Sequence, residues 1–176
     1  MRRREPAALA AFFERYFDQV HGLAYYLLGE RTAAEDLTQE VFLKVHRAAH
    51  QLDSSRDPGP WLSAIAYNAC RDLWRSGAYR LARRSASIDQ EAGVALTLTH
   101  GDDPEHHALQ GERERLVREA ITRLPDSLRA VVLLYDYQGL SHQEVALVLQ
   151  LGHAAARKRY SRALAALGKM LRGRLG

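Results

Sequence analysis

The chain has 176 residues, of which 47% are hydrophobic and 26% charged, a composition that excludes disorder as a description of the whole and allows one ordinary domain or two small ones. Its net charge of +4 at pH 7 indicates little about partners by itself. A single cysteine, Cys70, excludes an intramolecular disulfide, and the lack of any apolar run of about 18 residues argues against membrane insertion, so we expect a cytoplasmic protein.

Three amphipathic helices are predicted in the first 76 residues, because apolar residues recur there at steps of three and four. The first helix ends near Gly29. The second follows at once, and Thr32 and Glu35 have the spacing of a capping box at its start. After the turn-rich segment 51–60, the third helix is expected over residues 61–76.

Residues 77–107 are predicted to form a flexible linker, since no helical period is sustained there. Between Ser85 and Glu105 the chain has five acidic residues and neither lysine nor arginine. A brief alternation at 94–99 would suit a short strand, but it has no partner strand. The acidic character fits either a basic channel in a partner or solubility alone.

A second helical group is predicted from Ala108, with a break at Pro125 and a C-terminal cap at Gly139. The sequence contains no internal repeat, heptad pattern or low-complexity run that would indicate another fold. We therefore expect an all-α protein with two small helical domains, residues 1–76 and 108–176, joined by the linker.

The end of the chain has the order of elements of a helix-turn-helix. Ser141 and Glu144 form a capping box for a helix of about two turns. Residues 150–152 then provide a brief turn before a longer helix. In this motif the second helix enters the major groove of DNA.

The last helix combines an inward stripe, led by Ala156 and Tyr160, with a basic outer face. Between Gln150 and Gly176 there are seven lysine or arginine residues and no acidic one. Inner positions of such a face read base edges, and flanking cations contact phosphates. A solvated cationic face is the alternative. The residues expected at the major groove are Arg157, Lys158, Arg159, Ser161 and Arg162.

Three segments resemble conserved regions of bacterial sigma factors of the extracytoplasmic-function (ECF) group. The segment from Asp36 to Phe42, DLTQEVF, is similar to the family's second region, and Trp61 to Asp72 is similar to its promoter-melting helix. Residues 124–144, with Leu-Pro at their start and Gly-Leu-Ser near their end, are similar to the opening of the fourth region. The order and spacing of the segments carry the resemblance, which covers most of residues 9–76 and 110–171.

The resemblance implies a transcription initiation factor that catalyses nothing alone, needs no cofactor and directs RNA polymerase core to promoters. Residues 1–76 would be a region 2-like domain that docks on polymerase and recognises and melts the minus-ten element. Residues 108–176 would be a region 4-like domain that recognises the minus-thirty-five element. The implied partners are the clamp of the polymerase largest subunit, the flap region, promoter DNA and an anti-sigma factor.

The polymerase-binding residues implied by the resemblance are Asp36, Gln39 and Glu40. They share one helix face, and carboxylates four residues apart repel each other by a few tenths of a kcal/mol. A basic partner would relieve that repulsion, and the family places this face against the clamp coiled coil. A solvated face, with Lys44 nearby, is the alternative.

The residues expected to bind single-stranded promoter DNA are Asn68, Arg71, Trp74 and Arg75. They combine hydrogen-bond donors, positive charge and an aromatic ring, as single-stranded DNA requires. The family uses this helix to hold an unstacked base of the minus-ten element. Core packing is the alternative for Trp74, and it is the preferred interpretation for Trp61.

The helix-turn-helix turn departs from the family pattern. Leu149-Gln150-Leu151-Gly152 stands where the family usually has Leu-Gly-Ile-Ser. Gln150 is therefore expected to adopt a positive φ at a cost of about 1 kcal/mol, while Gly152 can still cap the next helix. Because of this departure, the resemblance does not predict which DNA sequence the chain prefers.

Two alternative functions remain open at this point. A dimeric helix-turn-helix regulator would bind duplex DNA without polymerase. A helical metal-binding protein would use histidines, namely His46 and His50 on one helix and His100, His106 and His107 near the linker, although zinc sites usually need three or four placed ligands. No catalytic residue or resident metal is expected, since the chain has no glycine-rich phosphate loop and no nucleophile in a recognisable setting.

Overall fold

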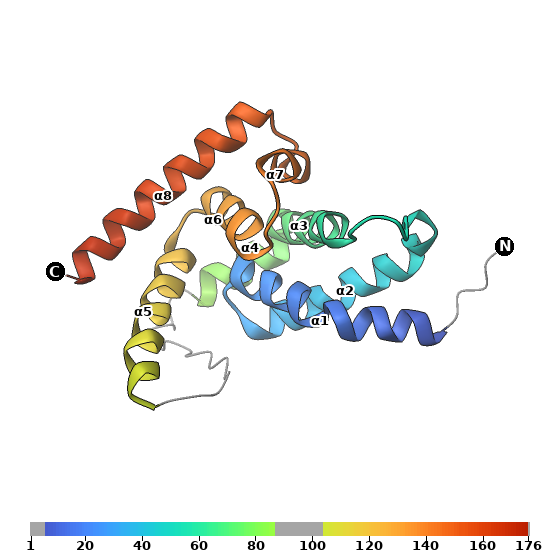
Figure 1. The fold of residues 1–176 in the computed structure, drawn as a ribbon, viewed down its shortest axis with the longest axis horizontal. Coiled ribbons are helices and arrows are strands. Elements are labelled where there is room, and N and C mark those ends of the chain that lie inside the picture. Colours follow the sequence, from blue (N-terminus) through green and yellow to red (C-terminus); the bar gives the residue numbers. More distant parts are fainter. Residues whose placement is uncertain (1–5, 87–103, 176) are drawn as a thin grey trace.

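The computed structural model describes residues 6–86 and 104–175, and every regular element within these ranges is a helix (Figure 1). The all-α expectation is confirmed for these residues. None of the helices described there is both long enough and apolar enough to cross a lipid bilayer. The helices form two consecutive groups along the chain, called here the first helical group (α1–α4) and the second helical group (α5–α8).

The first helical group is built around apolar stripes of three long helices. The stripes meet in a core where Leu23, Leu27, Leu37, Val41 and Leu62 are each at most 2% exposed. Burying one such side chain stabilises the fold by about 1.5–3 kcal/mol. The elements are α1 Pro6–Leu28, α2 Arg31–Ala48, a 3-10 turn Ala49–Gln51, α3 Gly59–Arg75 and α4 Gly77–Ala86.

Glu30, and not Thr32, caps the start of α2. Its carboxylate accepts hydrogen bonds from the backbone N–H groups of Thr32 and Ala33, at 2.9 and 2.7 Å. Glu35 pairs instead with Arg31, at 3.0 Å. The capping box predicted at Thr32 and Glu35 is therefore wrong: α2 already begins at Arg31, which places Thr32 inside the first turn rather than at the cap position.

Helix α4 occupies residues where a linker was predicted, so that expectation is wrong for residues 77–86, and it is also wrong for residues 104–107, where helix α5, Pro104–Arg123, has already begun. The Ser76 hydroxyl oxygen accepts a hydrogen bond from the Tyr79 backbone N–H at 3.2 Å and so caps the helix. Tyr79 packs against the core, and Arg83 reaches Asp126 of the second helical group at 3.4 Å. Tertiary contacts of this kind stabilise a short helix that its own sequence period does not reveal.

The second helical group follows the predicted breaks. Pro125 separates its first two helices, and Gly139, with φ +71°, ends the stretch before the helix-turn-helix. The predicted linker between α4 and α5, including the alternation at 94–99, lies outside the described residues. The elements are α5 Pro104–Arg123, α6 Asp126–Val132, a π-helical turn Leu133–Tyr137, α7 His142–Leu149 and α8 His153–Leu175.

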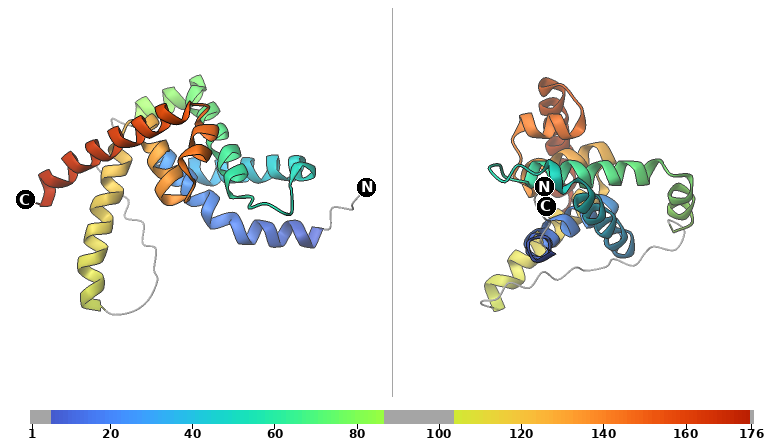
Figure 2. Two further views of the ribbon diagram at one scale, coloured as in Figure 1. Left: turned by 45° about the horizontal axis from the view of Figure 1, so that its top comes forward. Right: turned by 90° about the vertical axis from the view of Figure 1, so that its right-hand side faces the viewer.

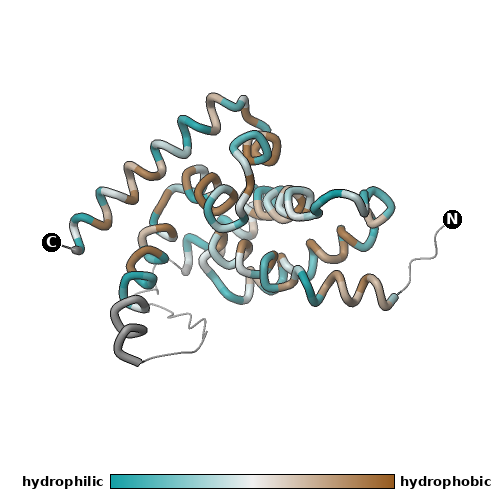
Figure 3. The backbone as a smooth tube through the Cα atoms, viewed as in Figure 1, coloured by the Kyte–Doolittle hydropathy of each residue, from teal (hydrophilic) through white to brown (hydrophobic). Residues whose placement is uncertain are grey.

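The two helical groups pack against each other and share one apolar core. Helices α1 and α3 contact elements of the second group, including α6 and α7. Figure 2 shows α5 and the end of α8 projecting away from the remaining helices, and Figure 3 shows hydrophobic stretches in both groups. The arrangement of the two predicted domains, which the sequence leaves open, is thus a packed one.

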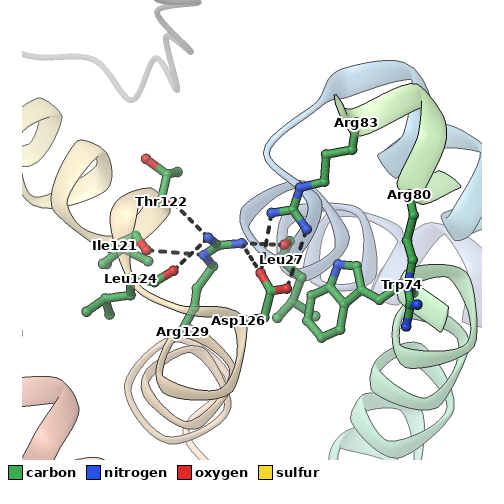
Figure 4. A network of polar contacts seen from close by, with 9 residues as sticks. All are labelled: Leu27, Trp74, Arg80, Arg83, Ile121, Thr122, Leu124, Asp126 and Arg129. Atoms are coloured by element: carbon green, nitrogen blue, oxygen red, sulfur yellow. Dashed lines mark hydrogen bonds and ion pairs between the residues drawn. The ribbon is translucent and has the colours of Figure 1, made fainter. Parts of the chain in front are cut away.

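A buried arginine joins the two groups near the α5–α6 turn (Figure 4). The Arg129 side chain is almost fully buried, and desolvation lowers the pKa of its guanidinium. Because a buried charge needs partners, the guanidinium donates five hydrogen bonds of 2.7–3.3 Å, to the carbonyl oxygens of Leu27, Ile121, Thr122 and Leu124 and to the carboxylate of Asp126.

Cys70 is fully buried in α3, as its interpretation as a small core residue predicts. Burial raises the pKa of its thiol, chiefly by desolvation. Since the thiolate is the reactive form of cysteine, this side chain stays protonated and inert at neutral pH.

Candidate polymerase and nucleic-acid interfaces

The turn of the helix-turn-helix has the backbone strain expected from its sequence. Gln150 lies in the left-handed region with φ 55°, and it is the sole non-glycine residue with positive φ among those described. The N–H of Leu151 donates to the Ala146 carbonyl at 2.9 Å, which closes the end of α7. The N–H of Ala156 donates to the Gly152 carbonyl at 3.0 Å and starts α8. The predicted capping box at the start of α7 is also confirmed, with Ser141 and Glu144 bonded reciprocally.

Helix α8 buries one side and exposes a basic face on the other. Ala156 and Ala163 are fully buried, so the helix lies close to its neighbours. The side chains of Arg157, Lys158, Ser161 and Arg162 are exposed, and Arg159 is half-buried. The five residues expected at the major groove therefore lie along the outer side and one edge of α8, where a double helix can approach them.

An aromatic cluster fixes α8 against the elements before it. The rings of Tyr135 and His142 stack with centroids 4.1 Å apart, and the Tyr160 ring lies 4.7 Å from Tyr135. The Tyr160 hydroxyl donates to the Asp136 carboxylate at 3.1 Å. Burial and then this hydrogen bond raise the pKa of Tyr160 to about 12, so the bond persists across the physiological pH range.

Helix α3 carries the residues expected to bind single-stranded DNA. Asn68, Arg71 and Trp74 are half-buried, and Arg75 is exposed. The Asn68 Oδ1, Arg71 Nε and Trp74 Nε1 atoms are buried without a hydrogen-bond partner among the described residues. An unpaired buried polar atom costs about 1–3 kcal/mol and needs an explanation in a native structure. Three of the four predicted residues share this property.

Trp61 and Trp74 both pack against the core, half-buried. The preferred core interpretation of Trp61 is confirmed. The Trp74 ring meets Tyr67 edge-on at 6.4 Å, yet its indole N–H has no partner. Trp74 thus packs against the core and leaves one buried donor unpaired.

The acidic face of α2 is fully accessible. Asp36, Gln39 and Glu40 are all exposed, and Glu40 pairs with Lys44 at 2.9 Å. Leu43 lies on the same face, seven residues after Asp36, and is 60% exposed. Sequence reasoning missed Leu43, although the step of seven from Asp36 indicates its position. Leu43 therefore adds one apolar side chain to this accessible acidic face.

The histidines do not come together in the described part of the chain. His46 and His50 are exposed at the end of α2 and in the following turn. Within residues 6–85 and 111–174 no three histidine, cysteine or acidic side chains lie close enough to hold a metal ion. The side chains of His100, His106 and His107 lie outside the described residues.

Two family models match the chain in sequence order. The model for Sigma-70 region 2 matches residues 12–80, and the model for Sigma-70, region 4 matches residues 114–167. The first match contains the acidic face of α2 and the whole of α3. The second contains the helix-turn-helix.

Individual proteins agree with these matches. The chain is 36% identical over 146 residues to the probable RNA polymerase sigma factor RfaY of Xanthomonas campestris pv. campestris, covering 83% of this chain and 36% of that protein. It is 30% identical over 168 residues to the ECF RNA polymerase sigma factor BldN of Streptomyces coelicolor, covering 95% of this chain and 61% of that protein. The chain thus spans about a third and three fifths of the length of these relatives.

A solved structure has the same fold. The sigma factor RpoE from Bartonella quintana, in complex with the anti-sigma factor NepR, superposes with a TM-score of 0.72 at 18% identity. The alignment covers 93% of this chain and 96% of that one. The likeness extends to both helical groups.

Proposed function

The chain belongs to the sigma-70 family, in its ECF group, and from this premise we propose that it binds core RNA polymerase in the cytoplasm and directs transcription to a defined set of promoters. The observation that carries the proposal is the succession of region 2 and region 4 in one chain, each with an accessible face of the appropriate charge. The protein contributes binding and recognition, and the polymerase contributes the chemistry.

The first helical group provides the polymerase contact. The exposed carboxylates of Asp36 and Glu40, with Gln39 and the apolar Leu43 beside them, fit a basic helical surface such as the clamp coiled coil. Unlike charges across an interface accelerate association and set its orientation. The residue 1–76 domain thus docks on polymerase through α2.

Helix α3 of the same domain holds the minus-ten element. Promoter melting exposes unpaired bases, which stack on aromatic rings at about 1–3 kcal/mol each. Trp74 supplies the ring, Asn68 supplies an amide that can read a base edge, and Arg71 and Arg75 supply charge for the phosphates. The unpaired Asn68 Oδ1 and Trp74 Nε1 atoms support this role.

The residue 108–176 domain recognises the minus-thirty-five element with α8, and contacts the flap region of polymerase. Lys158, Ser161 and Arg162 read base edges in the major groove, while Arg157 and Arg159 contact the flanking phosphates. Residues 87–103 connect the two helical groups along the chain. An anti-sigma factor is a further partner, as NepR is for the Bartonella quintana protein.

Retention on core polymerase separates this function from that of a dimeric regulator. We expect the purified chain to co-elute with core enzyme in gel filtration and to be monomeric alone. A dimeric regulator would instead elute as a dimer, separately from core enzyme. It would also bind duplex operator DNA tightly without polymerase. That second outcome would overturn the proposal.

The phosphate role of Arg157 predicts a specific salt dependence. Arg157→Ala should reduce the slope of log affinity against log salt concentration by about 0.9, because each neutralised phosphate releases a fixed fraction of a counterion. The measurement is the affinity of the polymerase holoenzyme for promoter DNA across a salt series. Lys169→Ala, the loss of an exposed cation farther along α8, is the matched control and should leave the slope unchanged. An unchanged slope for Arg157→Ala would show that Arg157 does not contact a phosphate.

A further inference from the structure

The chain has three lysines, and their electrostatic environments differ. They are Lys44, Lys158 and Lys169. Lys44 is half-buried and pairs with Glu40 at 2.9 Å. Lys158 and Lys169 are both exposed on α8, and neither makes a hydrogen bond or an ion pair with any described residue. The two lysines of α8 therefore have free ammonium groups, whereas that of Lys44 is held by a carboxylate.

Helical geometry directs positive charge toward Lys158. Side chains of an α-helix tilt toward its N-terminus, so that each covers the residues three and four positions earlier. Arg162 follows Lys158 by four positions, and Arg157 and Arg159 flank it. Arg157 and Arg162 are exposed and, within the described part of the chain, pair with no other residue. Lys158 thus lies among cations that no carboxylate compensates.

The carboxylates that bond to α8 lie away from this face. Asp136 accepts a hydrogen bond from Tyr160, which packs on the core side of the helix. Glu119 accepts one from Arg174, at the C-terminal end. The α8 helix itself contains no acidic residue. An anion that approaches Lys158 is therefore attracted by several cations, and no carboxylate of α8 repels it.

Lys169 lies on the same helix with fewer free cations around it. Gly173, four positions later, has no side chain that could tilt toward it. Arg172 follows by three positions, and Arg174 is already paired with Glu119. Lys169 is therefore an exposed lysine of the same helix in a weaker positive field, and it serves as an internal control for Lys158.

The turn before Lys158 leaves its amine open to a small molecule. The side chain tilts over Ala154 and Ala155, which are both exposed. Their methyl groups add little bulk and accept no hydrogen bond. The amine is therefore reachable, and the free guanidinium groups of Arg157 and Arg162 lie beside it as partners for a phosphate.

We infer that Lys158 is a site of acylation by small acyl phosphates, whose phosphate group is bound by Arg157 and Arg162. The uncharged amine of Lys158 attacks the carbonyl carbon, and an amide bond forms. The bond from that carbon to the phosphate oxygen breaks, and inorganic phosphate leaves with a proton from the amine. The acyl phosphate supplies both the acyl group and the leaving group. The product has lost the positive charge of the lysine.

Acylation removes one cation from the DNA-binding face of α8, a consequence that rests on the proposed function. Lys158 is placed there at the base edges of the minus-thirty-five element. Loss of one base contact should weaken the affinity of the holoenzyme for promoter DNA by at least about fivefold. The docking face of α2 is on the other helical group and keeps its charges. The modified chain should therefore still be retained on core polymerase.

Acetyl phosphate added to the full chain tests the inference, with mass spectrometry of each lysine as the readout. At low salt Lys158 should react about three- to tenfold faster than Lys169, because each further cation adds a modest attraction for the anionic reagent in water. Lys44 should react most slowly, since Glu40 holds its ammonium group. The preference for Lys158 should fall as salt rises.

A neutral reagent and two variants separate recruitment of the anion from simple access. The N-hydroxysuccinimide ester of acetic acid is uncharged and should modify Lys158 and Lys169 at nearly equal rates. Arg157→Gln with Arg162→Gln should reduce the rate at Lys158 to that at Lys169 with acetyl phosphate, and should change nothing with the neutral ester. Arg172→Gln, the matched control on the same helix, should leave the rate at Lys158 unchanged with both reagents.

Equal rates at Lys158 and Lys169 with acetyl phosphate would overturn the inference. So would an equal preference for Lys158 with the neutral ester, since access alone would then explain the reaction. Neither result bears on the proposed function, because retention of the unmodified chain on core polymerase does not depend on lysine acylation. Failure of that retention would in turn leave the measured acylation rates as they are.

Discussion

Arg129→Leu should lower the free energy of unfolding by about 3–5 kcal/mol, because removal of one partner from a buried charged network leaves the other groups unpaired. The carbonyl oxygens of Leu27 and Leu124 are buried and accept bonds from this guanidinium at 2.8 Å each. Leucine fills part of the volume but donates nothing. Urea unfolding followed by circular dichroism measures the loss.

The matched control for Arg129 is Arg123→Leu, an exposed arginine at the end of α5. Surface changes of this kind are usually within about 0.5 kcal/mol. Arg129→Lys should fall between the two, since an ammonium group cannot reproduce the planar fork of a guanidinium. A loss below about 1 kcal/mol for Arg129→Leu would show that the network does not hold the α5–α6 turn against α1.

Reversal of the acidic face, with Asp36→Lys and Glu40→Lys together, should weaken binding to core polymerase by about 100-fold or more. Like charges facing each other across an interface cost several kcal/mol, and about 2.7 kcal/mol corresponds to 100-fold. Competition with labelled parent protein for core enzyme gives the affinity. The loss should shrink as salt rises, because exposed charges are screened.

Glu14→Lys with Asp18→Lys is the matched control for that reversal. Both residues are exposed and four apart on α1, so the change in net charge and spacing is the same. The control should bind core polymerase nearly as well as the parent. If both double variants lost the same affinity for core polymerase, the effect would be one of overall charge. The acidic face of α2 would then not be the docking face.

Local features were predictable because their causes are local. The capping box at Ser141 and Glu144 and the positive φ of Gln150 follow from a few neighbouring side chains, and both are present. The buried stripe of α8 likewise follows from helical spacing, with Ala156 and Ala163 fully buried.

Features that depend on distant residues were not predictable. Helix α4 is held in part by the ion pair of Arg83 with Asp126, more than 40 residues away. From the sequence alone, Arg129 would be expected on the surface of a short helix. The packing of α1 beside that helix places the Leu27 carbonyl within hydrogen-bond distance of its guanidinium. Glu30 was not predicted as the cap because α2 begins at Arg31, earlier than its apolar stripe indicates.

The candidate sites were located by residue type and spacing, whereas their accessibility came from the fold. The acidic residues of α2 and the basic residues of α8, apart from the half-buried Arg159, are exposed, as an interface requires. Asn68 and Arg71 are instead half-buried: Asn68 lines a groove with Leu147 of α7, and Arg71 donates a hydrogen bond to Gln150, which follows α7. Helical period alone cannot reveal these contacts, because they result from the packing of two groups that the sequence separates.

Transcription in vitro with purified core polymerase on a library of promoter fragments tests the central claim most directly. The account predicts that adding this chain to core enzyme yields transcripts from a subset of fragments that share two spaced elements, and that Asp36→Lys with Glu40→Lys abolishes them. Transcription that is no higher than with core enzyme alone on every fragment, while the chain binds duplex DNA by itself, would contradict it.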